Sequence, residues 1–207
     1  MILPSLYAIT DRALAGGLSH EEIVHRLVDG GVRLIQMREK GLPDRPLLAH
    51  AMAAVRAAHG AGAVLVINDR PDVAVLSGAD GAHVGDMDLP AAEARRLLGA
   101  SRLLGVSTHA TEDALRAGDL PVDYVALGPI FETSHAAVAR PAVGLKAVSR
   151  AASGLRVPLV AIGGITLDRA ADVIDAGAAS IAVMGDLMTA KDIAARAAAY
   201  RDRLIRR

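Results

Sequence analysis

The chain has 207 residues and a formal net charge of +0 at pH 7, and 52% of its residues are hydrophobic although only 2% are aromatic. This length suits one domain with a substantial core built from Ala, Val, Leu and Ile. The neutral balance argues against a general nucleic-acid or membrane-surface binder, and the absence of cysteine excludes disulfides, thiolate metal sites and cysteine nucleophiles. No apolar run approaches the ~20 residues of a membrane span, and the N-terminus lacks a charged leader, so we expect a mature cytoplasmic protein.

Short apolar runs alternate with longer helical segments along the whole chain. Several runs are nearly continuous in Val, Ile, Leu and Ala, which is typical of strands buried on both faces. The predicted strands are Leu6–Thr10, Leu34–Arg38, Val64–Asn68, Gly81–Val84, Leu103–Ser107, Tyr124–Phe131, Leu159–Ile162 and Ser180–Met184.

The segments between these strands have helical composition. Ser19 and Glu22 have the spacing of a capping box, so they predict a helix start. The other predicted helices are Asp44–His59, a short turn at Pro71–Ser77, Leu89–Leu98, Thr111–Ala117, Leu145–Ala152, Asp168–Ala176 and Ala190–Ile205. Glycines that precede strands, within Ser77–Gly81 and Asp175–Ala179, fit helix C-caps.

This alternation predicts parallel strands joined by right-handed crossovers. An open doubly wound sheet and a closed barrel both have this pattern. Eight βα units in the chain favour a single parallel (β/α)₈ TIM barrel over residues 1–207. The one long irregular stretch, Glu132–Val143, follows the sixth strand and suits a lid over an active site.

Active sites of such barrels lie at the C-terminal ends of the strands. After the second strand, alternation places Gln36, Arg38 and Lys40 on one side, with Met37 and Glu39 on the other. Two cations and an amide therefore converge, and both cations suit a phosphate or diphosphate group.

The ends of other strands carry complementary groups. Asp69 and Asp88 are hard oxygen ligands after neighbouring strands, and Mg²⁺ takes one or two carboxylates together with substrate phosphate oxygens. Gly163 and Gly164 offer backbone N–H groups to a second anion, at the usual phosphate site of this fold. The sequence thus predicts one site for phosphate-bearing ligands.

Each of these signals also has a purely structural interpretation. Asp69 and Arg70 could form a strand-end ion pair, Arg38 and Glu39 a salt bridge in the barrel floor, and Gly163–Gly164 only a tight turn. Among the histidines, we expect packing for His83, substrate contact as one alternative for His109, and surface positions for His20, His25, His50 and His59.

Eight segments in this order resemble thiamine phosphate synthases and cover nearly the whole chain: YAITDR, IQMREKGL, INDRPDVA, GADGAHVGDMDLP, GVSTHA, DYVALGPIFET, VAIGGIT and DAGAASIAVM. Thiazole tautomerases share this barrel and superfamily. The resemblance implies an enzyme that joins hydroxymethylpyrimidine diphosphate to thiazole phosphate, giving thiamine phosphate and pyrophosphate. The implied mechanism is dissociative, so that diphosphate leaves before the thiazole nitrogen attacks the pyrimidine methylene cation.

The resemblance also implies roles for particular residues. Asp69 and Asp88 would bind Mg²⁺, and Arg38, Lys40 and Ser107 would act in catalysis. The substrates would be small molecules, with neither nucleic acid nor membrane as partner, and a homo-oligomer is possible. The substrate-binding set would be Gln36, Arg38, Lys40, Asn68 and Ser107 for the pyrimidine diphosphate, and Thr133, Gly164, Met184 and Gly185 around the thiazole phosphate.

The sequence departs from the family pattern around the predicted lid. Ala136 stands where the synthases carry a lysine, and His135 or Arg140 would have to replace its charge; Arg140 is the better substitute because it stays charged at pH 7. Asp86 replaces a glutamine and Gly185 a serine. A thiazole tautomerase and a catalytically weak relative that binds thiazole phosphate are therefore the alternatives. Tautomerases tend to lose the aspartates at positions 69 and 88 and to carry histidine where this chain has Pro129.

Overall fold

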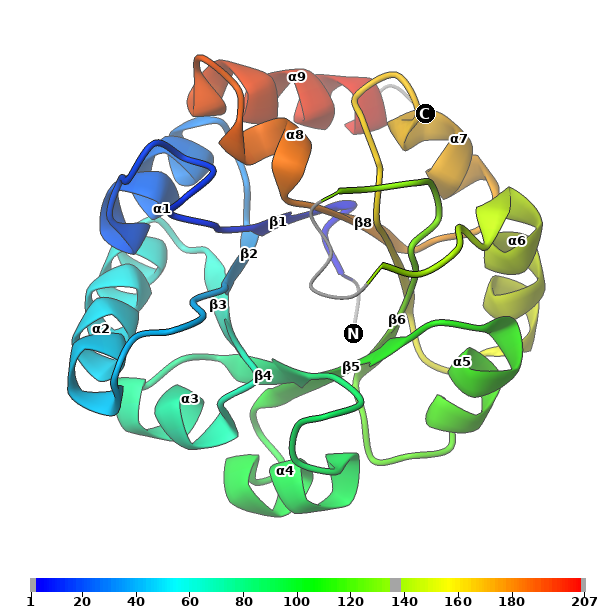
Figure 1. The fold of residues 1–207 in the computed structure, drawn as a ribbon, viewed down its shortest axis with the longest axis horizontal. Helices are drawn as coiled ribbons and strands as arrows, with labels where there is room; N and C mark the ends of the chain where they lie inside the picture. Colours follow the sequence, from blue (N-terminus) through cyan, green and yellow to red (C-terminus); the bar gives the residue numbers. More distant parts are fainter. Residues whose placement is uncertain (1–2, 135–138, 206–207) are drawn as a thin grey trace.

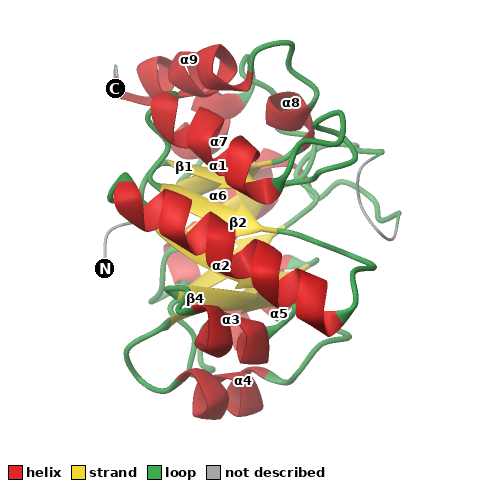
Figure 2. Ribbon diagram, turned by 90° about the vertical axis from the view of Figure 1, so that its left-hand side faces the viewer, coloured by secondary structure: helices red, strands yellow, loops and turns green. Residues whose placement is uncertain are grey.

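A computed structural model describes residues 3–134 and 139–205. Its strands close into a parallel barrel in sequence order, with the last strand paired to the first. Figure 1 looks along this barrel, and Figure 2 shows the strands enclosed by helices. The strands are β1 (Leu6–Ile9), β2 (Leu34–Met37), β3 (Val64–Asn68), β4 (Gly81–Val84), β5 (Leu103–Thr108), β6 (Tyr124–Leu127), β7 (Leu159–Ile162) and β8 (Ser180–Val183). The predicted (β/α)₈ TIM barrel is confirmed.

A ring of helices covers the outside of the barrel (Figure 1). Its members are α1 (His20–Asp29), α2 (Asp44–Gly60), α3 (Pro71–Ser77), α4 (Ala91–Leu98), α5 (Thr111–Ala117), α6 (Gly144–Gly154), α7 (Ala170–Asp175) and α9 (Ile193–Ile205), while α8 (Gly185–Met188) is one short turn after β8. Among the described residues, no helix is long and apolar enough to cross a membrane.

The apolar core has two layers, because each strand buries both faces. The larger layer lies between strands and helices and includes Ile35, Leu65 and Val125. The smaller layer fills the barrel and includes Tyr7, Val66 and Tyr124. Burial on both sides explains why the strands read as continuous apolar runs.

Local signals set several helix ends as predicted. Ser19 caps α1: its hydroxyl accepts from the Glu22 backbone N–H at 3.2 Å, and its own N–H donates to the Glu22 carboxylate at 2.8 Å. Gly78 ends α3 in the left-handed region at φ +76°. The reciprocal hydrogen bonds between Ser19 and Glu22 satisfy two N–H groups that the start of a helix leaves without partners.

Two predicted elements are corrected. The sixth strand ends at Leu127 instead of Phe131, because Pro129 follows and proline has no N–H to continue the sheet. The last predicted helix, Ala190–Ile205, begins only at Ile193, and the separate turn α8 precedes it.

Candidate active site

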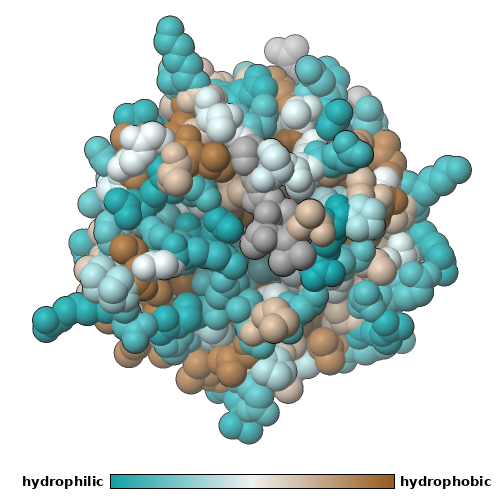
Figure 3. Space-filling model, viewed as in Figure 1, coloured by the Kyte–Doolittle hydropathy of each residue, from teal (hydrophilic) through white to brown (hydrophobic). Residues whose placement is uncertain are grey.

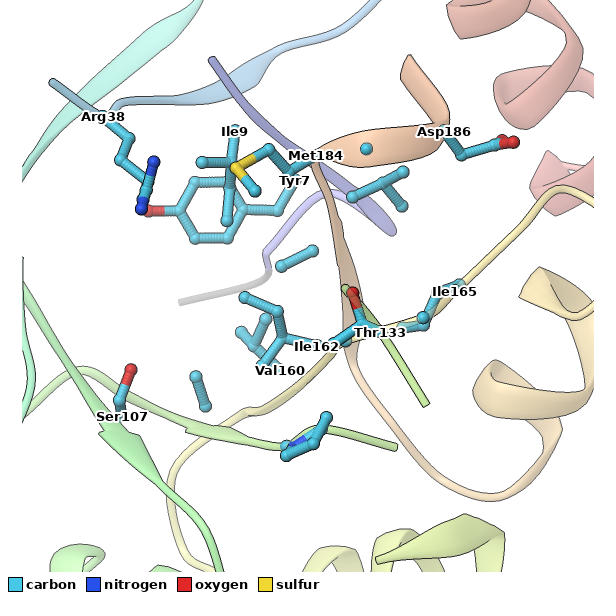
Figure 4. Close-up of a pocket in the computed structure, with 18 of the residues that line it drawn as sticks. Tyr7, Ile9, Arg38, Ser107, Thr133, Val160, Ile162, Ile165, Met184 and Asp186 are labelled. Carbon is cyan, nitrogen blue, oxygen red and sulfur yellow. The ribbon is translucent and has the colours of Figure 1, made fainter. Parts of the chain in front are cut away.

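One cavity of about 550 Å³ opens at the C-terminal ends of the strands. Figure 4 shows Arg38 and Ser107 on one side of it and Thr133 and Ile165 on the other. Hydrophilic side chains gather beside its mouth toward α1 and α2, left of centre in Figure 3. Every predicted substrate-binding residue lines this cavity: Gln36, Arg38, Lys40, Asn68, Ser107, Thr133, Gly164, Met184 and Gly185.

The end of β2 supplies the cations, as its alternation predicts. Gln36, Arg38 and Lys40 line the cavity, whereas Met37 is buried on the helix side of the barrel. The Arg38 guanidinium donates to the Asp11 carboxylate at 2.8 Å. Because Arg38 pairs with Asp11, the alternative of a floor salt bridge between Arg38 and Glu39 is wrong. A guanidinium that is held by this ion pair and lines the cavity has further N–H groups that suit a phosphate oxygen.

Next to these cations lies a carboxylate pair, Asp69 and Asp88. Burial raises the pKa of Asp88, and the neighbouring Asp69 carboxylate raises it further. The Asp88 carboxylate accepts the Gly85 N–H at 2.7 Å, and the Lys40 ammonium lies 3.2 Å from Asp69. Two acidic groups this close favour a bound cation.

The backbone at Asp69 is itself unusual. Asp69 is the one non-glycine residue with positive φ in the described part of the chain, at +63°. Its neighbour Arg70 pairs with Asp72 and Asp44, so the predicted alternative of an Asp69–Arg70 ion pair is wrong. Left-handed backbone at a non-glycine residue is often retained at functional sites.

The opposite wall holds a glycine cradle, formed by Gly163, Gly164 and Gly185. Gly163 and Gly164 have φ of +97° and +64°. A Cβ atom on Gly164 would lie 2.5 Å from the Glu132 carbonyl oxygen, so this turn packs directly on the loop after β6. The cradle is therefore more than a tight turn, since it brings bare backbone to the cavity wall.

Helix α9 stabilises this cradle from behind. The Arg196 guanidinium donates to Asp186 at 2.7 and 3.0 Å, and the Tyr200 hydroxyl donates to the same carboxylate. Tyr200 also lies 3.3 Å from the Ile165 carbonyl oxygen. Tyr200 thus links the loop after β7 to α8, which together carry the cradle.

One histidine differs from expectation. His20 is fully buried instead of exposed: its Nδ1 lies 2.9 Å from the Thr10 hydroxyl and its Nε2 lies 3.2 Å from Glu39. The same Thr10 hydroxyl accepts the Arg38 N–H at 3.2 Å, so His20 supports the end of β2. Burial lowers the pKa of His20 to about 4. Helix position alone gave no sign of these partners.

His83 is packed, as expected, but it also lines the cavity, and sequence reasoning missed this role. Its ring stacks on Tyr124, and its Nε2 lies 2.8 Å from the Ser107 hydroxyl. Strand alternation could have found it, because His83 and Gly81 share a face of β4. Tyr7 is a second missed cavity residue.

The loop after β6 contacts its neighbours through Arg140, which lies 3.2 Å from Asp86. Asp86 also lies 3.6 Å from His109, and both Arg140 and His109 line the cavity. His135 and Ala136 lie outside the described residues. Arg140 therefore lies at the cavity wall, beside Asp86, and its role toward the substrate stays a prediction.

Fold and site define the class: a (β/α)₈ enzyme with a cavity at the C-terminal ends of its strands, which is lined by cations on one side and by bare glycine backbone on the other. The particular family follows from comparison with known proteins. The chain belongs to the thiamine monophosphate synthase family, whose model matches residues 6–187.

Similar proteins agree with this assignment. The thiamine-phosphate synthase of Methanoculleus marisnigri is 42% identical over 199 residues, covering 96% of this chain and 94% of that protein. That of Moorella thermoacetica is 40% identical over 197 residues, covering 95% and 94%. The solved structure of a thiamine phosphate pyrophosphorylase from Pyrococcus furiosus has a TM-score of 0.90 at 32% identity, covering 98% of this chain and 96% of that one.

Proposed function

We propose that this chain is a transferase that makes thiamine phosphate and pyrophosphate from hydroxymethylpyrimidine diphosphate and thiazole phosphate. The observation that carries the proposal is the division of one cavity between two anion-binding walls. Arg38 and Lys40 stand on the β2 side, and Gly164 and Gly185 on the β7–β8 side. A reaction between two phosphate-bearing substrates needs two such places with a common space between them.

The residues present fit a magnesium ion on the diphosphate side. No group of three or more acidic or histidine ligands exists among the described residues. The carboxylate pair of Asp69 and Asp88 lies beside the Lys40 ammonium and would supply two oxygen ligands. Mg²⁺ commonly takes one or two carboxylates and completes its shell with phosphate oxygens and water. When bound, the ion would stabilise charge on the departing diphosphate.

The chain's own groups would do the remaining work. Arg38 and Lys40 hold the diphosphate and stabilise the charge that develops as it leaves. The buried Asn68 side-chain nitrogen has no hydrogen-bond partner among the described residues, so it would donate to a ligand atom at the cavity wall. Ser107 lines the same cavity and would contact the pyrimidine or its departing diphosphate. The cradle positions the thiazole phosphate, and the apolar walls exclude water, which would otherwise capture a pyrimidine cation.

An assay for thiamine phosphate from both substrates, with Mg²⁺ and with a chelator, tests the proposal. Synthesis should require both substrates and Mg²⁺. Asp69→Asn and Asp88→Asn should each abolish Mg²⁺-dependent synthesis while the fold persists, and Asp113→Asn on α5 serves as an exposed carboxylate control. Absence of synthesis by the wild-type chain would contradict the function, and full activity of both aspartate variants would contradict the metal site alone.

Two predictions from the sequence belong with this proposal. The enzyme would act in the cytoplasm, where small phosphorylated substrates are available, and it could assemble as a homo-oligomer. Cell fractionation tests the location, and light scattering on the purified chain tests the assembly.

A further inference from the structure

Polar side chains join end to end across the interior of the barrel. The Gln36 amide nitrogen donates to the Tyr7 hydroxyl at 2.9 Å, and the Tyr7 and Tyr124 hydroxyls lie 2.9 Å apart. The Tyr124 hydroxyl lies 3.1 Å from His83 Nδ1, and His83 Nε2 lies 2.8 Å from the Ser107 hydroxyl. We call these residues the barrel chain. Its two ends, Gln36 and Ser107, both line the cavity.

The apolar packing is arranged around the barrel chain. The Tyr7 and Tyr124 rings meet edge to face with centroids 5.9 Å apart, and the Tyr124 and His83 rings stack at 5.6 Å. A Cβ atom on Gly105 would lie 2.0 Å from Cζ of Tyr124, so only glycine leaves room for this phenol. Packing and hydrogen bonds therefore fix the same ring positions.

The number of hydroxyl and ring protons determines which group donates and which accepts in each hydrogen bond of the barrel chain. Each tyrosine has one hydroxyl proton, and the neutral histidine ring, the main form at pH 7, has one N–H and one acceptor nitrogen. Tyr7 accepts from Gln36 and can give its own proton to Tyr124. If Tyr124 donated to Tyr7 instead, the Tyr7 proton would have no acceptor among the hydrogen bonds of the described residues. Such a loss is costly for a side chain that is only 1% exposed.

We propose that Tyr7, Tyr124 and His83 are positioning residues, which hold His83 as the Nε2–H tautomer and aim the Ser107 hydroxyl proton into the cavity. Tyr124 donates to His83 Nδ1, and His83 Nε2–H donates to the Ser107 oxygen. Ser107 then meets a ligand as a donor, while Gln36 keeps its amide oxygen as an acceptor. The tautomer follows from the barrel chain itself; only the identity of the ligand rests on the proposed function.

The tautomer can be measured without any substrate. Long-range ¹H–¹⁵N correlation spectra of the whole protein at pH 7 distinguish a protonated from an unprotonated ring nitrogen. The wild-type protein should show His83 protonated at Nε2 and unprotonated at Nδ1. Tyr124→Phe removes the donor to Nδ1, so the proton should divide between both nitrogens. Tyr200→Phe removes the buried hydroxyl on α9 and should leave His83 unchanged.

Either of two spectra would overturn the proposal: a wild-type His83 protonated at Nδ1, or a Tyr124→Phe spectrum identical to wild type in a folded protein. If Tyr124→Phe does not fold, Tyr7→Phe decides the point. It leaves His83 Nδ1 as the acceptor for the Tyr124 proton, so His83 should stay protonated at Nε2, and a proton on Nδ1 would contradict the proposal. An inactive wild-type chain with the expected tautomer would contradict the proposed function alone.

Kinetics with two substitutions at His83 separate positioning from mere packing. Glutamine can place an amide N–H near the position of Nε2, whereas asparagine reaches only the position of Nδ1. His83→Gln should therefore keep kcat within about threefold of wild type, and His83→Asn should lower it about tenfold, the effect of one hydrogen bond. Equal losses in both variants would show that His83 only fills space.

Discussion

The Lys40 ammonium lies 3.2 Å from the carboxylate of Asp69, so a cation expected to bind diphosphate contacts a carboxylate expected to bind metal. The Lys40 side chain is 50% exposed, and such ion pairs contribute little stability. Exchanging this contact for diphosphate and Mg²⁺ therefore costs little. Diphosphate that binds Lys40 should free the Asp69 carboxylate for Mg²⁺, and Mg²⁺ that binds Asp69 should free the Lys40 ammonium for diphosphate. Each ligand should therefore favour binding of the other.

Lys40→Ala should raise the KM for the pyrimidine diphosphate by roughly 10- to 100-fold, the effect of one charge-assisted hydrogen bond. It should also reduce the degree to which Mg²⁺ tightens that substrate. Steady-state kinetics over a range of Mg²⁺ concentrations measure both effects. Lys146→Ala, an exposed substitution on α6, is the control. An unchanged KM would contradict the proposal that the diphosphate binds at the end of β2.

Gly164→Ala should destabilise the protein more than Gly62→Ala. The two glycines have nearly equal φ, +64° and +66°, so both substitutions place alanine in the left-handed region. Only at Gly164 would the new Cβ meet other atoms, 2.5 Å from the Glu132 carbonyl oxygen, whereas nothing lies within 4 Å at Gly62. We expect ~1 kcal/mol lost at Gly62 and ~3 kcal/mol at Gly164 in urea unfolding. Equal losses would mean that the loop after β6 does not confine Gly164.

Substitutions of Arg140 and of Asp86 should have opposite effects on the KM for the pyrimidine diphosphate. Arg140→Ala should raise the KM for the pyrimidine diphosphate, because it removes a cation at the cavity mouth. Asp86→Asn should lower that KM, because it releases Arg140 from its 3.2 Å contact with Asp86. The contact is exposed, so both changes should be several-fold at most. The matching prediction from the sequence is that Ala136→Lys tightens the same substrate. If all three variants bind it like the wild type, this loop has no electrostatic role.

Stability should fall as the pH drops below neutral, in part through His83. Burial lowers its pKa from 6.5 to about 4, so the unfolded chain binds the proton more readily than the folded one. Its contribution is therefore complete above pH 6.5 and is lost as the pH falls toward 4, by up to about 3 kcal/mol. Unfolding free energies measured over this range should decline less steeply for His83→Gln than for wild type. The exposed His25→Gln should follow the wild-type curve.

Tyr200→Phe should weaken thiazole phosphate binding selectively. The substitution removes the hydroxyl that links Asp186 to the Ile165 carbonyl, and hence the tie between the two parts of the cradle. The KM for thiazole phosphate should rise about threefold to tenfold, while the KM for the pyrimidine diphosphate stays constant. A parallel rise in both constants would indicate a general loss of structure, which thermal melting would reveal.

Periodicity and composition predicted the barrel, its strand order and the convergence of Arg38 and Lys40. They succeeded because inside and outside positions alternate along each strand, independently of what lies opposite. The same reasoning could not predict that His83 meets Ser107 or that His20 meets Thr10 and Glu39. Such meetings depend on which strands and helices become neighbours and on their register.

Strand ends were less predictable than strand centres. The apolar run that continues from Leu127 through Phe131 reads as strand, yet Pro129 cannot donate to a neighbouring strand. The turn α8 is too short to give a periodic signal. The end of β6 and the turn α8 both lie at the cavity. Functional sites are where local sequence rules are most often broken.

The cations at the end of β2 and the glycine cradle come from different parts of the polypeptide. The strands that carry the cations and carboxylates end before residue 85, and the cradle is built from residues after 162. Substitutions can therefore change one of these two sets of residues without changing the other. Under the proposed function, substitutions confined to the last two βα units would change the site for thiazole phosphate and leave the site for the diphosphate unchanged.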